Sequence, residues 1–138
     1  WMADVPRLEW ARVEATMAPA APPLQPERLA ALTPERLATM QIHFAPALRL
    51  LSVASAALAW LRSDRAPGRH RVTVAVSRRG WQVVERVLGR DEARVMALLR
   101  DGCTLADVIR LVPASAAHLG AWLQTWTTDG LVVGVEDA

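Results

Sequence analysis

Apolar side chains recur at helical spacing in the first part of the chain, over residues 4–17. The face that they form consists of Leu8, Ala11 and Ala15 and is widened by Trp10, Val13 and Met17. Four prolines between positions 19 and 26 then interrupt an alanine-rich stretch, which is typical of a linker. Residues 27–32 and 34–38 predict two short helical turns, the second with Thr33 as its N-cap.

The apolar spacing changes to every second residue at position 40. Residues 40–44 therefore predict a half-buried strand, and residues 48–51 predict a second strand or a continuation of the first. A short helix is expected over residues 55–62, followed by a loop over residues 63–69 that contains a Pro-Gly pair.

The clearest local pattern lies in residues 71–88. Valine alternates with more polar side chains, the run Arg78-Arg79-Gly80 interrupts the alternation, and the alternation resumes from Trp81. This pattern predicts a β-hairpin in which Gly80 supplies the positive φ of the turn.

Three helices are expected after the hairpin. The first ends at Gly102, and Thr104 and Asp107 form a capping-box-like pair at the start of the second. Ser115 is expected to cap the third helix, and residues 131–135 to form a last strand.

These elements predict an α+β fold in which an N-terminal helix and linker pack on a winged-helix-like domain made of the β-hairpin, the three helices and the C-terminal strand. The expected division is residues 1–39 (N-terminal helix, proline-rich linker and short helices) and residues 40–138 (the winged-helix-like domain). Five tryptophans are expected to lie mainly in the core: Trp10, Trp60, Trp81, Trp122 and Trp126.

Charge is distributed unevenly, although the net charge of the 138 residues is only +2. All sixteen basic residues are arginine, and ten of them fall within residues 62–100, against four acidic residues. Residues 101–138 hold one arginine and five acidic residues. The third helix of the predicted trio offers only His118 and Gln124 for base contacts, which is unfavourable for reading DNA.

The basic hairpin suits a protein or peptide partner better. An extended acidic peptide can add to an exposed hairpin edge, where backbone hydrogen bonds supply affinity. The candidate binding residues are therefore Arg71, Arg78, Arg79 and Arg86. The alternative is that these arginines only keep an exposed edge soluble.

The side chains able to support catalysis or hold a metal are few. Cys103 is the single cysteine, and His43, His70 and His118 lie far apart, outside any metal-ligand spacing. We therefore expect no catalytic residue, no cofactor and no bound metal, and a protein that is not an enzyme.

A membrane segment is not expected either. Residues 44–61 are largely apolar, but Pro46, Arg49 and the change of period argue against a span. No secretory signal follows the first residue, so we expect a cytoplasmic protein. Because Trp1 precedes Met2, we expect that the chain begins inside a longer protein or is only the ordered part of one.

Several short segments, spread in order over nearly the whole chain, are specific as a set. They are Val5 to Ala11, Leu37 to Phe44, Pro46 to Leu51, Ala59-Trp60, Asp91 to Cys103, Thr104 to Asp107, Trp122-Leu123 and Gly130 to Gly134. Together they resemble a bacterial family that carries the label "DNA-binding domain", with Val5 to Ala11 similar to its L-A-x-L-E-W-A stretch.

The resemblance implies a partner protein encoded beside a multinuclear non-haem iron oxidative enzyme with a TIM-barrel fold. Such pairs modify cysteines in ribosomally made peptides (RiPP maturation), as in methanobactin-type or bufferin-type systems. The implied role is accessory: the chain binds the precursor peptide and docks on the enzyme that holds the iron. A preceding helical domain is also implied, with Trp1 at the join. The alternative is a winged-helix DNA-binding transcriptional regulator, and the family has no motif from which contact residues are transferred.

Overall fold

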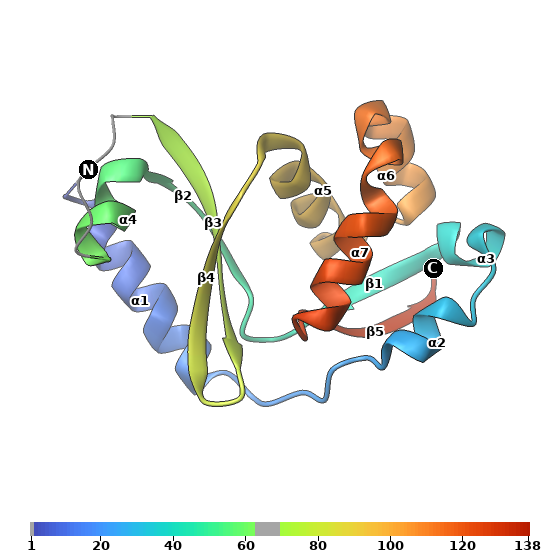
Figure 1. Ribbon diagram of the computed structural model, residues 1–138, viewed down its shortest axis with the longest axis horizontal. Helices are drawn as coiled ribbons and strands as arrows, with labels where there is room; N and C mark the ends of the chain where they lie inside the picture. Colours follow the sequence, from blue (N-terminus) through green and yellow to red (C-terminus); the bar gives the residue numbers. More distant parts are fainter. Residues whose placement is uncertain (1, 63–69) are drawn as a thin grey trace. The chain divides into compact units, whose positions relative to one another are not determined.

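The computed structural model describes residues 2–62 and 70–138 (Figure 1). The chain divides into two compact units, unit 1 from residues 1–19 and 46–89 and unit 2 from residues 20–45 and 90–138. Unit 1 contains α1 (Asp4–Met17), β2 (Arg49–Ala54), α4 (Ser55–Leu61), β3 (Arg71–Arg79) and β4 (Gln82–Leu88). Unit 2 contains α2 (Pro26–Ala30), α3 (Pro34–Ala38), β1 (Met40–Phe44), α5 (Arg90–Arg100), α6 (Leu105–Leu111), the 3-10 helix η1 (Pro113–Ala117), α7 (Leu119–Thr128) and β5 (Val132–Asp137).

The mixture of helices and strands confirms the α+β class. The helix over residues 4–17, the strand over residues 40–44 and the hairpin over residues 71–88 are found where the sequence predicts them. The loop expected over residues 63–69 lies outside the described residues. Among the described residues, no helix combines the length and apolar character needed to cross a membrane.

Unit 1 is a three-stranded antiparallel sheet in the order β2-β3-β4, with α1 packed on one face. The β3–β4 connection is a two-residue turn, because Arg79 pairs with Gln82 across Gly80 and Trp81. Gly80 has a φ of +62°, as the hairpin pattern predicts, and this conformation is strained for residues with a side chain.

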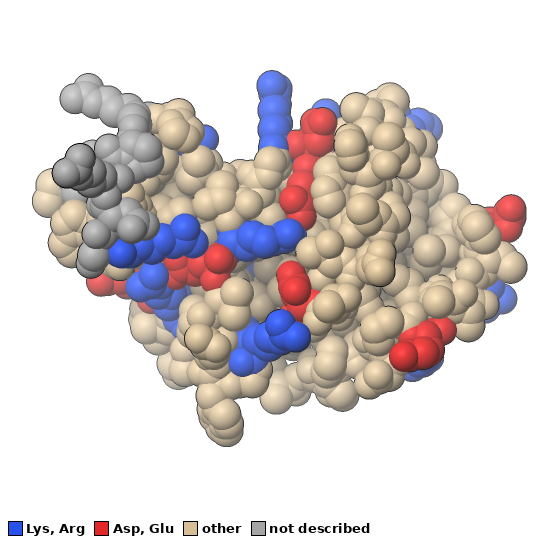
Figure 2. Space-filling model, in the orientation of Figure 1, with Lys and Arg blue, Asp and Glu red and all other residues tan. Residues whose placement is uncertain are grey.

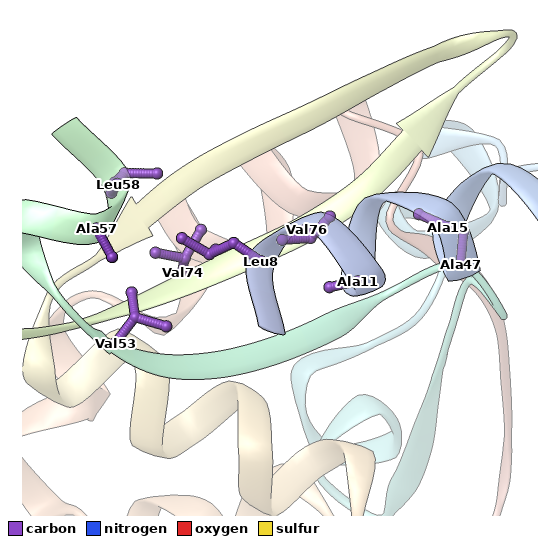
Figure 3. Close-up of a cluster of buried hydrophobic side chains, with 9 residues drawn as sticks. All are labelled: Leu8, Ala11, Ala15, Ala47, Val53, Ala57, Leu58, Val74 and Val76. Atoms are coloured by element: carbon purple, nitrogen blue, oxygen red, sulfur yellow. The ribbon is translucent and has the colours of Figure 1, made fainter. Parts of the chain in front are cut away.

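The core of unit 1 lies between α1 and the sheet (Figure 3). It is built from small and β-branched side chains: Leu8, Ala11, Ala15, Ala47, Val53, Ala57, Leu58, Val74 and Val76. The alanines at 11 and 15 let the helix approach the valines of β3 closely, which favours dense packing. The helical face predicted from Leu8, Ala11 and Ala15 is therefore confirmed as the buried one.

Unit 2 surrounds a two-stranded antiparallel sheet, β1-β5, with helices. An isolated bridge joins Gln41 of β1 to Thr104, the residue before α6. The capping box predicted at α6 is present: Thr104 Oγ1 accepts from the Asp107 N–H, and the Asp107 carboxylate accepts from the Thr104 N–H. The same backbone bond holds the pKa of Asp107 below its usual value.

The expected grouping of hairpin and helices differs from the one observed. The hairpin belongs to unit 1 with β2 and α1, whereas the three helices belong to unit 2 with β1 and β5. The expected boundary at residue 40 also differs from the boundaries of the two units. The hairpin was expected to pack with the helices because it precedes them directly in the sequence. In the structure, however, β3 of the hairpin pairs with β2, and the strand that pairs with β5 in unit 2 is β1, far away in the chain.

Three of the five tryptophans expected in the core are exposed. Trp10 is 62% exposed, Trp60 57% and Trp81 95%, whereas Trp126 is completely buried and Trp122 is half-buried. The expectation was wrong for these three: Trp10 and Trp60 lie on the exposed sides of α1 and α4, and Trp81 lies in the hairpin turn. Large aromatic side chains at such positions remain in water.

The predicted cap of the third helix was also wrong. Ser115 lies inside the 3-10 helix η1, where its buried hydroxyl donates to the Val112 carbonyl. α7 instead follows His118, which contributes no side-chain cap. The proline at 113 starts a separate short helical turn before α7 begins.

Candidate functional site

The outer edge of β4 is the most open part of the sheet in unit 1. Within the described residues, β4 pairs with β3 on one side and with no strand on the other. Residues that flank a two-residue turn form a hydrogen-bonded pair, so Gln82 points its backbone groups toward β3. By alternation, Val83, Glu85 and Val87 point theirs outward.

Valine supplies three of the seven side chains along this edge. Val84 is 42% exposed and Val87 is 45% exposed. The one backbone contact at the outer edge among the described residues is weak: Arg62 Nη2 donates to the Glu85 carbonyl at 3.5 Å. An open, valine-rich edge is the kind of surface that proteins normally cover or use for strand addition.

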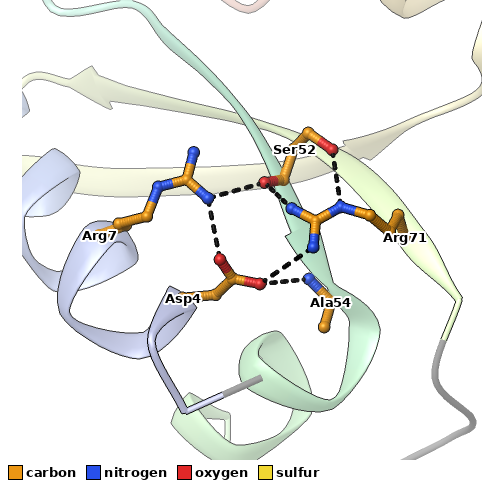
Figure 4. Close-up of polar contacts among 5 residues, drawn as sticks. All are labelled: Asp4, Arg7, Ser52, Ala54 and Arg71. Carbon is orange, nitrogen blue, oxygen red and sulfur yellow. Dashed lines mark hydrogen bonds and ion pairs between the residues drawn. The ribbon is translucent and has the colours of Figure 1, made fainter.

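The opposite edge of the sheet, at β2, is covered by side chains (Figure 4). Asp4 accepts a 2.8 Å hydrogen bond from the Ala54 N–H, and Arg7 donates to the Ser52 carbonyl at 3.0 Å. Arg71 donates to the same carbonyl at 2.6 Å and also pairs with Asp4. The two edges therefore differ, with β2 closed at this end and β4 open.

The pKa of Asp4 is held below its usual value by the same contacts. The hydrogen bond from the Ala54 N–H is the main cause, opposed by burial and assisted by Arg7 and Arg71. Arg71, predicted as a partner-binding residue, is therefore engaged within the fold.

Arg78 is engaged as well. Its Nη1 donates to the Thr16 carbonyl at 2.5 Å, close to the C-terminal end of α1. Cations in that position satisfy free carbonyls and complement the helix dipole. Arg79 is exposed and makes no hydrogen bond or ion pair with the described residues, and Arg86 is half-buried on β4. Among the four predicted residues, Arg79 is the one with an exposed and uncommitted guanidinium.

We expect Arg78→Ala to destabilise the protein by about 1 kcal/mol, because it removes a hydrogen bond to a helix-end carbonyl. Arg79→Ala is the matched control and should change stability by less than about 0.5 kcal/mol. Urea denaturation followed by circular dichroism measures both. Equal stabilities of the two variants would contradict the role given to Arg78.

A pocket opens beside the β4 edge, on the side of the sheet that α1 covers. Its volume is about 390 Å³, and its lining is Arg12, Arg62, Val83 and Glu85. Arg12 Nε donates to the Glu85 carboxylate, and Arg62 Nε lies 3.9 Å from the other carboxylate oxygen. In Figure 2, basic and acidic side chains lie next to one another over the region of α1 and β4.

This pocket could not be predicted from the sequence, because its residues come from three separate elements. Arg12 lies on α1, Arg62 follows α4 and Glu85 lies on β4. A signal was nevertheless present: Glu85 alternates with Val83 and Val87, so an acidic side chain interrupts an otherwise apolar strand face. Such a position usually indicates a charged partner.

The histidines and the cysteine are dispersed. His43 pairs with Glu136 at 3.3 Å, His118 lies against Trp122, and His70 is exposed. Cys103 is a half-buried free thiol whose N–H donates to the Leu98 carbonyl at the end of α5. Within residues 2–62 and 70–138, no three His, Cys, Asp or Glu side chains are grouped so that they could hold a metal ion.

In comparisons with known proteins, no family model matches the chain, and no curated protein or solved structure matches it.

Proposed function

We propose that this protein is a non-catalytic partner that binds an extended precursor peptide and docks on an iron-dependent peptide-modifying oxidative enzyme. The observation that carries the peptide-binding part is the open outer edge of β4. The family resemblance of the sequence supports the enzyme and the class of peptide.

Strand addition at β4 requires backbone groups that face outward. The N–H and C=O groups of Val83, Glu85 and Val87 satisfy this requirement by alternation from the turn. A peptide strand paired with these groups would form up to six backbone hydrogen bonds, each contributing about 1 kcal/mol. The weak contact from Arg62 to the Glu85 carbonyl is easily replaced.

The surrounding charge supports an acidic peptide. Residues 1–19 and 46–89, which form unit 1, carry ten arginines and five acidic residues, and Arg79 is exposed at the end of the hairpin. A field of this sign accelerates the association of acidic partners. The attraction of an acidic peptide to the hairpin is therefore assigned mainly to Arg79, whose guanidinium is exposed.

Val87→Pro tests the edge directly. Proline at an outward-facing position removes one N–H and blocks strand addition, while the bonds to β3 remain. We expect Val87→Pro to weaken peptide binding by about tenfold or more, since a lost bond and a steric block act together. The measurement is fluorescence anisotropy with a labelled, cysteine-containing peptide of the precursor class that the family resemblance implies.

Leu50→Pro is the matched control, because Leu50 lies on β2 with the same outward parity as Ser52 and Ala54. It should leave peptide affinity unchanged. Unaltered affinity in Val87→Pro would contradict edge binding. Copurification with an iron-dependent oxidative enzyme of the class that the resemblance implies tests the docking part, and failure of the two proteins to associate would overturn it.

The alternative is a winged-helix DNA-binding regulator, favoured by the three helices and small sheet of unit 2. The bridge between Gln41 and Thr104 adds a strand-like contact between α5 and α6, as a winged helix has. α7, however, carries no charged side chain, and Gln124 is its one exposed amide, the kind of side chain that pairs with a base through two hydrogen bonds. Specific nanomolar binding to one operator that needs His118 or Gln124 would replace the peptide-binding proposal.

A further inference from the structure

We infer that the pocket beside β4 receives a carboxylate side chain of the added peptide strand, so that the peptide is selected for Asp or Glu at one position. This inference rests on the proposed function and specifies the chemistry that the same site recognises.

The balance of charge in the pocket favours an anion. Two guanidinium groups, those of Arg12 and Arg62, face a single carboxylate, that of Glu85. Glu85 is nearly buried, with a side-chain exposure of 8%, whereas the two arginine side chains are about one-third exposed. One positive charge is therefore left uncompensated by the pocket itself, and it is accessible.

The guanidinium donors are also incompletely used. Arg12 donates through Nε, and its Nη atoms make no hydrogen bond with the described residues. Arg62 holds Glu85 by contacts of 3.5 and 3.9 Å, which are long for a charge-assisted bond. A second carboxylate can bind these free donors in the two-pronged geometry that arginine favours.

The alternation of the edge strand brings a peptide side chain to this place. Val83, Glu85 and Val87 share the sheet face that α1 covers. In a strand added to β4, every second side chain points to that same face, within about 5.5 Å of its neighbour on β4. A residue of the peptide placed near Glu85 is thus beside both arginines.

The Arg62 guanidinium has two alternative partners in this arrangement, the Glu85 carbonyl and the peptide carboxylate. In the unbound protein its Nη2 donates to the outward Glu85 carbonyl, where a peptide N–H would bind. Strand addition displaces that contact, and the released guanidinium can then pair with the peptide carboxylate. The arginine would thereby protect the edge when it is empty and recognise the acidic residue when it is filled.

Three synthetic heptapeptides test the inference. They share an alternating Thr-Val sequence and carry Asp, Asn or Lys at the central position. Titration of the full chain by fluorescence anisotropy, in 0.15 M salt, should rank affinities as Asp, then Asn, then Lys, with about tenfold between Asp and Asn.

Two variants locate the effect in the pocket. Arg62→Gln should remove the preference for Asp over Asn, and Glu85→Gln should strengthen binding of the Asp peptide, because it removes the competing carboxylate. Arg28→Gln makes the same charge change as Arg62→Gln at an exposed position of α2 and should leave the preference unchanged. Circular dichroism checks folding, and Arg62→Gln carries the test if Glu85→Gln fails to fold.

The outcomes separate the inference from the proposed function. Equal affinities for the three peptides, with Val87→Pro still weakening all of them, would overturn the acidic pocket and leave edge binding intact. An Asp preference that is reduced equally by Arg28→Gln would also overturn it, because general electrostatics would then explain the preference. Absence of binding by all three peptides at concentrations up to about 1 mM would contradict the proposed function.

Discussion

Trp126→Ala should destabilise the protein by about 3–5 kcal/mol, the largest effect expected of a single substitution here. Trp126 is completely buried in unit 2, and its ring meets Phe44 of β1 edge-on at 5.8 Å. Its Nε1–H also donates to the Glu92 carboxylate at 2.9 Å. Truncation removes the packing of the ring and this hydrogen bond together.

Trp122→Ala is the matched comparison, since Trp122 stacks on Trp126 at 6.3 Å but is only half-buried. It should cost clearly less than Trp126→Ala. Urea denaturation monitored by circular dichroism gives both free energies of unfolding. A greater loss in Trp122→Ala would contradict the packing described for α7.

The local elements could be predicted because their causes are local. The bounds of α1 match the helical spacing, the capping box at α6 uses Thr104 and Asp107, and Gly80 supplies the positive φ of the hairpin turn. Each of these features depends on residues within a few positions of one another. Periodicity and cap chemistry are sufficient for such features.

The buried face of α1 shows where periodicity is insufficient. Leu8 and Ala11 lie on one side of the helix, and Trp10 and Val13 lie about half a turn away. Both sides are apolar, and hydrophobicity alone favours the larger side chains for the core. The sheet instead packs on the small residues, because they permit a close approach of helix and strands.

The candidate site could be predicted only in part, because its geometry depends on non-local pairing. The basic hairpin and its exposed edge follow from the sequence between residues 71 and 88. The contacts that Arg71 and Arg78 make with the two ends of α1 could not be predicted in this way. Their partners, Asp4 and Thr16, lie more than sixty positions away in the sequence. Prediction of the pocket around Glu85 would likewise require knowledge of contacts between residues far apart in the sequence.

The second large loss of stability is expected for substitution of Asp4, because this residue joins the start of α1 to the β2 edge. Its carboxylate accepts from the Ala54 N–H and from Arg7, both at 2.8 Å, and pairs with Arg71 at 3.5 Å. Asp4→Ala leaves the Ala54 N–H without its hydrogen-bond acceptor. We expect a loss of about 2 kcal/mol at pH 7, within the range for leaving a buried donor unsatisfied.

The loss should depend on pH with a definite sign. The pKa of Asp4 is lowered in the folded protein, mainly by the hydrogen bond from the Ala54 N–H. At acidic pH the Asp4 carboxyl group is therefore protonated less in the folded protein than in the unfolded chain. Its stabilisation is fully present above the unfolded pKa of about 3.9 and is lost as the pH falls through the lower folded value. The difference in stability between the natural protein and Asp4→Ala should therefore be constant from pH 7 to pH 5 and shrink below pH 4.

Asp101→Asn is the matched control, because Asp101 is exposed and makes no side-chain contact with the described residues. Urea denaturation at pH 7, 5, 4 and 3 measures all three proteins. The control should remain within about 0.5 kcal/mol of the natural protein at neutral pH. A difference between the natural protein and Asp4→Ala that grows as the pH falls would contradict the role of the ionised carboxylate, since protonation removes the interaction that the substitution also removes.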